Sequence, residues 1–172
     1  IIILRGGVAV DFAMNTVCAA GTGAFLDQQA ARLNINVESI GPLALQSKTP
    51  VRIAGRCTVF AESEIISLVA HGEPVDHILR GLHAGLVSRI LAMARGVGIV
   101  APLMLSGGVA RNAAIVALLG EQSGLEVQLP SRPQLMGAYG AALLAGARHT
   151  DDVRVVQQAR DCRDCGGVTL SK

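Results

Sequence analysis

The sequence predicts an α/β fold, and three features of the chain predict it. Apolar strand patterns and helical patterns alternate from Leu103 to Ala147, which is typical of parallel strands connected by helices. Two glycine-containing loops, Gly21 to Gly23 and Gly107 to Gly108, each follow a strand pattern and open a helical one. The chain has 172 residues, of which 51% are apolar, and this is enough for one domain with a sizeable core.

The first part of the chain predicts a hairpin followed by helices. Two strands, Ile1 to Leu4 and Val8 to Met14, flank a Gly-Gly pair that is a hairpin signal. A further short strand is expected from Val51 to Ala54, after a break at Ser47 to Pro50. Apolar residues recur at helical spacing in four stretches, which we expect to form helices at 24–33, 37–45, 59–70 and 74–95.

The second part predicts two strands and two helices. The strands are Pro102 to Leu105 and Leu125 to Leu129, with a helix between them that ends near Gln122. Pro133 begins a last helix to about residue 148, because proline is favoured in a first helical turn. The polar stretch 149–172 has no clear period, so we expect a domain over 1–148 and a loosely ordered tail over 149–172.

Composition excludes several classes of protein. A net charge of +2 argues against a large nucleic-acid interface. The sequence has no run of 18 uncharged apolar residues, so we predict no membrane span. Aromatic residues make up only 2%, so the core is expected to consist of Ala, Val, Leu and Ile. Four cysteines in so apolar a chain do not resemble a disulfide framework, which favours a cytoplasmic protein that uses thiols as ligands.

Two cysteines lie in loops that precede predicted helices. A helix N-terminus lowers the pKa of a thiol, so Cys18 and Cys57 are candidates to bind a soft metal or an iron–sulfur cluster. Two cysteines cannot fill four cluster positions, so the others would come from Cys162 and Cys165 or from a second subunit. The alternative is that Cys18 and Cys57 are small buried apolar residues, the commoner fate of a free cysteine.

The tail contains a Cys-x-x-Cys pair at Cys162 and Cys165, followed by two glycines. Half of a zinc knuckle has this spacing, but a tail with two exposed thiols is about as consistent with it. The four histidines show no ligand spacing and receive no role: they are His71, His77, His83 and His149.

The two glycine loops are candidate nucleotide-binding segments. Glycine allows a close approach of the backbone to a ligand, and a helix N-terminus offers unpaired N–H groups to a phosphate. Two such loops on one sheet could contact different parts of one nucleotide. The alternative is that both are ordinary strand-to-helix turns.

Four motifs in order resemble the ATP-dependent activators of 2-hydroxyacyl-CoA dehydratases and the related ATPase subunits of benzoyl-CoA reductases. The resemblance covers about Val10 to Ala145, and its cysteine motifs are the specific ones. The glycine motifs are shared with sugar kinases, heat-shock chaperones and actin. The motifs are Asn15 to Gly23, Arg56 to Glu64, Gly107 to Asn112 and Gly137 to Ala142.

The resemblance implies a ribonuclease-H-like, actin-like ATPase fold, of which this chain would form mainly the second half-domain. It implies ATP or ADP with Mg²⁺, and a [4Fe–4S] cluster shared by the two subunits of a homodimer. Each subunit would contribute Cys18 and Cys57 as ligands of this cluster. The implied nucleotide-binding residues are Gly21, Thr22 and Gly23 in the second phosphate loop, and Gly107, Gly108 and Asn112 in the nucleoside-binding motif.

The implied function is ATP-coupled transfer of a low-potential electron to a 2-hydroxyacyl-CoA dehydratase or benzoyl-CoA reductase-type partner. The electron donor would be a ferredoxin or flavodoxin. The first phosphate loop of the family has no counterpart in this sequence, so we expect the C-terminal portion of an activator, active as an ATPase only within a longer chain. Two alternatives stay open: a sugar- or acyl-kinase-like phosphotransferase, and a non-catalytic nucleotide-binding or assembly module.

Overall fold

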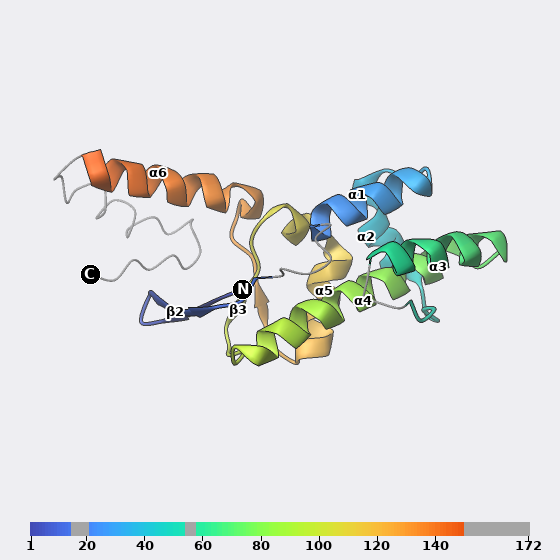
Figure 1. Ribbon diagram of the computed structural model, residues 1–172, viewed down its shortest axis with the longest axis horizontal. Helices are drawn as coiled ribbons and strands as arrows, with labels where there is room; N and C mark the ends of the chain where they lie inside the picture. Colours follow the sequence, from blue (N-terminus) through green and yellow to red (C-terminus); the bar gives the residue numbers. More distant parts are fainter. Residues whose placement is uncertain (15–20, 54–57, 150–172) are drawn as a thin grey trace.

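The structure is a computed structural model that describes residues 1–14, 21–53 and 58–149. It confirms the predicted order of a hairpin, four helices and then strand, helix, strand and helix (Figure 1). The elements are β1 (Ile2–Arg5), β2 (Val8–Phe12), α1 (Thr22–Arg32), α2 (Val37–Gln46), α3 (Thr58–Ala70), α4 (Val75–Gly96), β3 (Leu103–Met104), the 3₁₀-helix η1 (Gly108–Arg111), α5 (Ala113–Ser123), β4 (Val127–Gln128), the 3₁₀-helix η2 (Pro133–Leu135) and α6 (Met136–His149).

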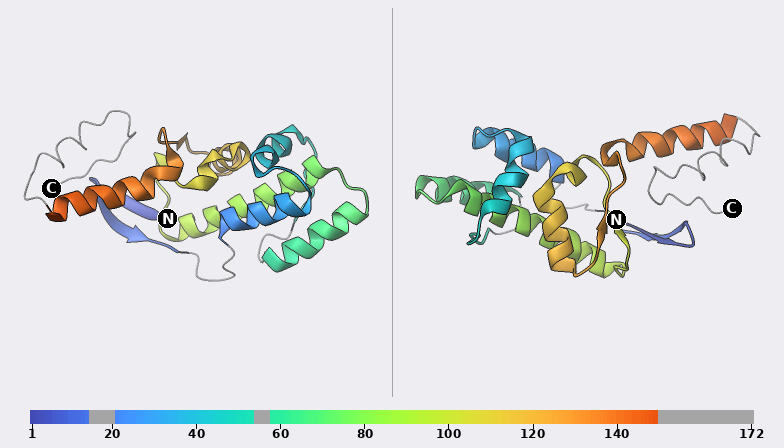
Figure 2. Two further views of the ribbon diagram at one scale, coloured as in Figure 1. Left: turned by 90° about the horizontal axis from the view of Figure 1, so that it is seen from above. Right: turned by 180° about the vertical axis from the view of Figure 1, so that it is seen from behind.

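Helix α4 lies at the centre of a group of helices, α1 to α5, which we call the helical body. It packs against α2, α3 and α5, and α2 packs in turn against α1 and α5 (Figure 2). Most apolar residues of α4 recur on one face and are buried there, as the helical spacing predicts. Four of them are Ile78, Leu79, Leu82 and Leu86. Burial of such a side chain contributes roughly 1.5–3 kcal/mol, so this face is a main source of stability.

The segment between α2 and α3 lies against α4 in an irregular conformation. The strand predicted from Val51 to Ala54 is wrong over residues 51–53, and Ala54 lies outside the described residues. The Val51 N–H donates to the carbonyl of His77 on α4, at 3.3 Å, where a strand would pair with another strand. A Cβ added to Gly81 of α4 would lie only 2.0 Å from the Val51 carbonyl oxygen, which shows how closely the two backbones approach.

The four described strands form two separate two-stranded sheets. Strands β1 and β2 are antiparallel, with Arg5 opposite Val8, and the predicted hairpin is therefore confirmed. Strands β3 and β4 are parallel, with Leu103 opposite Val127, and α5 connects them. The parallel pairing expected from the strand–helix alternation is thus present, although each strand is only two residues long.

The hairpin and α6 extend from one end of the helical body (Figures 1 and 2). All five residues of β2 are exposed, including Phe12 at 67%. Leu144 of α6 is 61% exposed. Among the described residues no helix is both long and apolar enough to cross a membrane.

Candidate functional site

A cleft of about 520 Å³ lies between the first turns of α1 and α2 and the 3₁₀-helix η1. It brings together residues from both glycine loops that the sequence singled out. Three of the predicted site residues line it, namely Gly23, Gly108 and Asn112. The other lining residues are Leu26, Asp27, Val37, Glu38, Val109 and Arg111.

The first glycine loop opens helix α1. Gly21 precedes the helix and accepts the first backbone hydrogen bond, from the Phe25 N–H at 2.9 Å. No described side chain caps this end and no acidic residue occupies the first turn. The N–H groups of the first turn, with the positive end of the helix dipole, are therefore available to an anion. Thr22 and Gly23, the first two helical residues, lie in this turn.

Gly23 lies close to the second glycine loop. A Cβ at this position would lie 3.5 Å from Cγ2 of Val109 in η1, which is ordinary van der Waals contact. The two glycine motifs therefore face one another across a short distance, as expected for two contacts with one ligand.

The second glycine loop makes a turn that requires glycine. Gly107 has φ 96° and ψ 175°, a backbone conformation that other residues rarely adopt. Its N–H donates to the carbonyl of Pro133 at 2.7 Å, which fixes the loop to η2. A Cβ on the next residue, Gly108, would meet no atom within 4 Å. The cleft-side backbone of Gly108 is therefore open to a ligand.

Asn112 caps helix α5 at the edge of the cleft. Its Oδ1 accepts hydrogen bonds from the backbone N–H groups of Ala114 and Ile115, at 3.0 and 3.2 Å. Its Nδ2 donates to Nε2 of His83, at 3.0 Å. The Asn112 side chain therefore joins the cleft wall to the buried face of α4, and one Nδ2 hydrogen remains for a ligand.

His83 is completely buried on α4. Its Nδ1 donates to the carbonyl of Leu79 at 2.7 Å, so Nε2 is the nitrogen without a proton. Burial lowers the pKa of His83 below its ordinary value of 6.5, and the nearby charge of Arg80 adds to this effect. The hydrogen bond that His83 Nδ1 donates to the Leu79 carbonyl opposes the shift without cancelling it. The imidazole is therefore neutral at pH 7.

Charged side chains line the cleft beside the glycines. Asp27 comes from α1, Glu38 from α2 and Arg111 from η1, and all three are exposed. Carboxylates accept hydrogen bonds from sugar hydroxyls, and a guanidinium binds phosphate oxygens. The cleft thus combines two polar backbone segments with acceptors and a cation, which suits a nucleotide.

The predicted cluster ligands, Cys18 and Cys57, lie outside the described residues. The tail pair, Cys162 and Cys165, also lies outside them. Among the described residues no group of three or more His, Cys, Asp and Glu side chains could hold a metal ion. Gly21, Thr22 and Gly107 are described and adjoin the residues that line the cleft.

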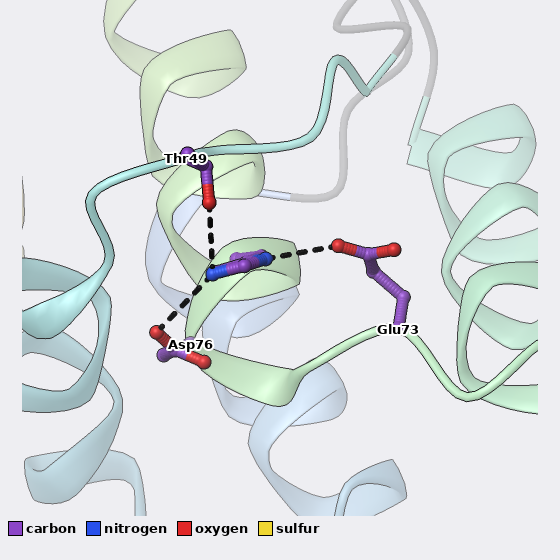
Figure 3. A network of polar contacts seen from close by, with 4 residues as sticks. Thr49, Glu73 and Asp76 are labelled. Carbon is purple, nitrogen blue, oxygen red and sulfur yellow. Dashed lines mark hydrogen bonds and ion pairs between the residues drawn. The ribbon is translucent and has the colours of Figure 1, made fainter.

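The segment that leads toward Cys57 is tied to the start of α4 by a polar network (Figure 3). His77 is at its centre, with Nδ1 3.0 Å from a carboxylate oxygen of Glu73 and Nε2 3.1 Å from the hydroxyl of Thr49. A carboxylate oxygen of Asp76 lies 3.8 Å from Nε2. These contacts hold the chain at Thr49 against α4, shortly before the region that contains Cys57.

Sequence reasoning missed four residues of this site: His83, Asp27, Glu38 and Arg111. One signal was available for His83, because it is four residues after Leu79 and three before Leu86 and so falls on the apolar face of α4. A polar residue on such a face needs a buried partner. Arg111 lies within the motif from Gly107 to Asn112, which was the available signal for it. Asp27 and Glu38 occupy ordinary exposed positions, and no sequence pattern distinguishes them.

Comparison with known proteins identifies relatives of the chain. Residues 1–145 match the BadF/BadG/BcrA/BcrD ATPase family. The (R)-2-hydroxyglutaryl-CoA dehydratase activating ATPase of Acidaminococcus fermentans is 41% identical over 84% of this chain and 56% of its own length. A benzoyl-CoA reductase subunit of Thauera aromatica is 32% identical over 90% of this chain and 56% of its own length. The chain thus spans about half the length of these relatives.

A solved structure has the same fold. The activator of the 2-hydroxyisocaproyl-CoA dehydratase from Clostridium difficile, with bound ADPNP, superimposes with a TM-score of 0.77. The two chains are 33% identical, and the match covers 95% of this chain and 57% of that one. The predicted α/β fold of the actin-like ATPase type is confirmed. The chain belongs to the BadF/BadG/BcrA/BcrD ATPase family.

Proposed function

We propose that this protein binds ATP and ADP with Mg²⁺ in the cleft between α1, α2 and η1. We propose that it couples this binding, as part of an activator, to electron transfer through a [4Fe–4S] cluster. The observation that supports the proposal is the cleft itself, which is lined by Gly23 and Gly108 from the two glycine motifs. The open first turn of α1 would receive phosphate oxygens, with Gly21 and Thr22 beside it. The segment from Gly107 to Asn112 would contact the nucleoside.

A substitution that fills the cleft tests nucleotide binding. Gly108→Val places a branched side chain in open space on the cleft wall, so the fold has room for it but the ligand does not. The affinity for Mg–ATP, measured by titration calorimetry, should fall on the order of tenfold or more, because a steric overlap of this kind costs about 1–3 kcal/mol.

The matched control for this test is Gly96→Val. Gly96 ends helix α4, has open space around its Cβ position and does not line the cleft. This variant should bind Mg–ATP as the unmodified chain does. Absence of nucleotide binding by the unmodified chain would contradict the proposed function and favour an assembly role.

The cluster would be held by Cys18 and Cys57. Each cysteine precedes a helix in the sequence: Cys18 precedes α1, and Cys57 directly precedes Thr58, the first residue of α3. Two thiolates are half of the four that a [4Fe–4S] cluster takes, which fits a cluster shared by two copies of the chain. When bound, the cluster supplies one-electron redox chemistry. The protein supplies the thiolates and the helix N-termini that favour negative charge nearby.

Anaerobic reconstitution with iron and sulfide tests this assignment. The unmodified chain should become brown and dimeric, with about four irons per dimer for one shared cluster. Cys18→Ala and Cys57→Ala should each lose the colour and the dimer together. Cys162→Ala is the matched control and should keep both, because the tail pair is outside the family motifs. A colourless, iron-free unmodified protein would contradict the cluster but not the nucleotide site.

The proposed partners follow from the same family membership. We propose that the electron acceptor is a 2-hydroxyacyl-CoA dehydratase or benzoyl-CoA reductase-type component, and that the donor is a ferredoxin or flavodoxin in the cytoplasm. The named activities of the relatives support this assignment.

A further inference from the structure

The nucleotide cleft is connected to the core by one chain of hydrogen bonds. It begins at the Leu79 carbonyl in α4, passes through the His83 imidazole and the Asn112 amide, and ends at the N–H groups of Ala114 and Ile115. Each contact is between 2.7 and 3.2 Å long. None of these groups except Asn112 lines the cleft.

Each group in this series of hydrogen bonds has only one orientation in which every contact joins a donor to an acceptor. The Leu79 carbonyl can only accept, so Nδ1 of His83 must carry the proton and Nε2 must accept. The backbone N–H groups at the start of α5 can only donate, so Asn112 must direct its oxygen toward them and its nitrogen toward His83. A flipped Asn112 amide would place donor against donor at the α5 end and acceptor against acceptor at His83.

The space around Asn112 is equally restricted. A Cβ added to Gly41 of α2 would lie 2.8 Å from Oδ1 of Asn112 and 3.2 Å from the Ala113 nitrogen. Helix α2 therefore packs directly against the amide on the side of Oδ1. Because α2 also contributes Val37 and Glu38 to the cleft, the position of Asn112 affects two walls.

We propose that His83 is a positioning residue for nucleotide binding: it orients the Asn112 amide, and through it the cap of α5 and the cleft segment from Gly108 to Arg111. This proposal rests on the proposed function for its ligand. His83 does not touch the nucleotide. It holds Asn112 so that the remaining Nδ2 hydrogen and the η1 backbone are in place before the nucleotide binds, which reduces the ordering cost of binding.

The test compares substitutions of His83 that remove or keep the acceptor. His83→Leu fills the space without an acceptor, and it should weaken Mg–ATP binding about tenfold because the Asn112 Nδ2 donor loses its partner. His83→Gln offers an oxygen where Nε2 lies and should stay within about threefold of the unmodified affinity. The stability control is Val87→Ala, which shortens a fully buried side chain on the same helix and should leave the affinity within about twofold.

A double-substitution cycle decides whether His83 acts through Asn112. Asn112→Ser keeps a capping oxygen but has no amide to orient. His83→Leu should therefore weaken binding much less in the Asn112→Ser background than in the unmodified chain. An equal loss of affinity in both backgrounds would overturn the proposal. So would a loss of affinity with Val87→Ala as large as that with His83→Leu.

Nitrogen-15 NMR provides a readout that does not need the ligand. At neutral pH the His83 ring should carry its proton on Nδ1, and the opposite tautomer would overturn the proposal. If the unmodified chain bound no nucleotide, the proposed function would fail, and hydrogen exchange would then decide the role of His83. His83→Leu should speed exchange of the Ala114 and Ile115 amides more than Val87→Ala does, and equal rates would overturn the proposal.

Discussion

The helical body and the β1–β2 hairpin are both rich in apolar residues, yet the helical body buries many of them and the hairpin buries few. Helix α4 has nine buried residues, whereas every residue of β2 is exposed. In the hairpin, Ile3 is buried and its neighbours Ile2 and Leu4 are 66% and 58% exposed. The two strands of the hairpin pair along their length, but a two-stranded sheet without a packed face is marginally stable in water.

This difference shows that a segment can form its expected secondary structure and still contribute little to the stability of the fold. The hairpin satisfies its local rules, with two positive-φ glycines in the turn and paired strands on either side. Its residues nevertheless remove little apolar surface from water, so they contribute little to the free energy of folding. The proposed nucleotide cleft lies where α1 and α2 of the helical body meet η1, next to a packed core. A binding site needs that rigidity, because its groups must be in place before the ligand arrives.

The largest expected effect is the loss of a core side chain from α4. Ile78→Ala removes most of a fully buried side chain and should lower the free energy of unfolding by about 2–5 kcal/mol. Phe12→Ala in the hairpin removes a larger side chain from a 67% exposed position and should change it by about 0.5 kcal/mol or less. Urea unfolding measures both. If Phe12→Ala lowered the free energy of unfolding as much as Ile78→Ala does, the hairpin would contribute to stability as the helical body does, and the contrast between the two regions would be wrong.

A smaller effect is expected where α4 meets the segment after α2. Gly81→Ala places a Cβ 2.0 Å from the Val51 carbonyl oxygen, so the backbone at Val51 must move and stability should fall by about 1–3 kcal/mol. The control is Gly96→Ala on the same helix, where the added Cβ meets nothing within 4 Å. That variant should be neutral or slightly stabilising, because alanine favours helix more than glycine does. Equal thermal unfolding of the two variants would contradict the close packing at Val51.

The smallest expected effect is a pH dependence of the free energy of unfolding, which originates from His83 in the helical body. His83 has a lowered pKa when folded, so below its ordinary value of 6.5 the unfolded chain binds more protons than the folded chain. The contribution of the neutral, buried His83 to the free energy of unfolding is complete above pH 6.5. It is lost as the pH falls below 6.5, at up to about 1.4 kcal/mol per pH unit. Arg80 faces His83 from the same helix, and Glu121 of α5 pairs with Arg80 at 3.0 Å.

Urea unfolding at several pH values between about 7.5 and 5, on either side of the ordinary histidine pKa, measures this slope. His83→Gln has no group that titrates at this position, so it should lose that part of the slope while keeping the acceptor for Asn112. An unchanged slope in His83→Gln would show that the pH dependence arises elsewhere in the chain.

The local elements and the motifs could be predicted from the sequence, because these depend on neighbours in the chain. The Gly6-Gly7 turn, the apolar period of α4 and the strand–helix–strand order after Leu103 all follow from local spacing, and the structure confirms each of them. The glycine motifs also carried the family resemblance. They showed which residues to consider for a nucleotide, but not that they would meet.

Tertiary structure alone decided which of those residues share a site. Gly23 and Gly108 form one cleft only because α1 packs against η1, a contact between segments far apart in the chain. The segment at Val51 has a strand-like sequence, but the Val51 N–H donates to the His77 carbonyl of α4, because tertiary packing brings this acceptor and no strand beside it. The role of His83 has the same origin: on α4 its sequence suggests only a histidine among leucines, and the α5 cap that it holds is brought to it by the packing of the two helices.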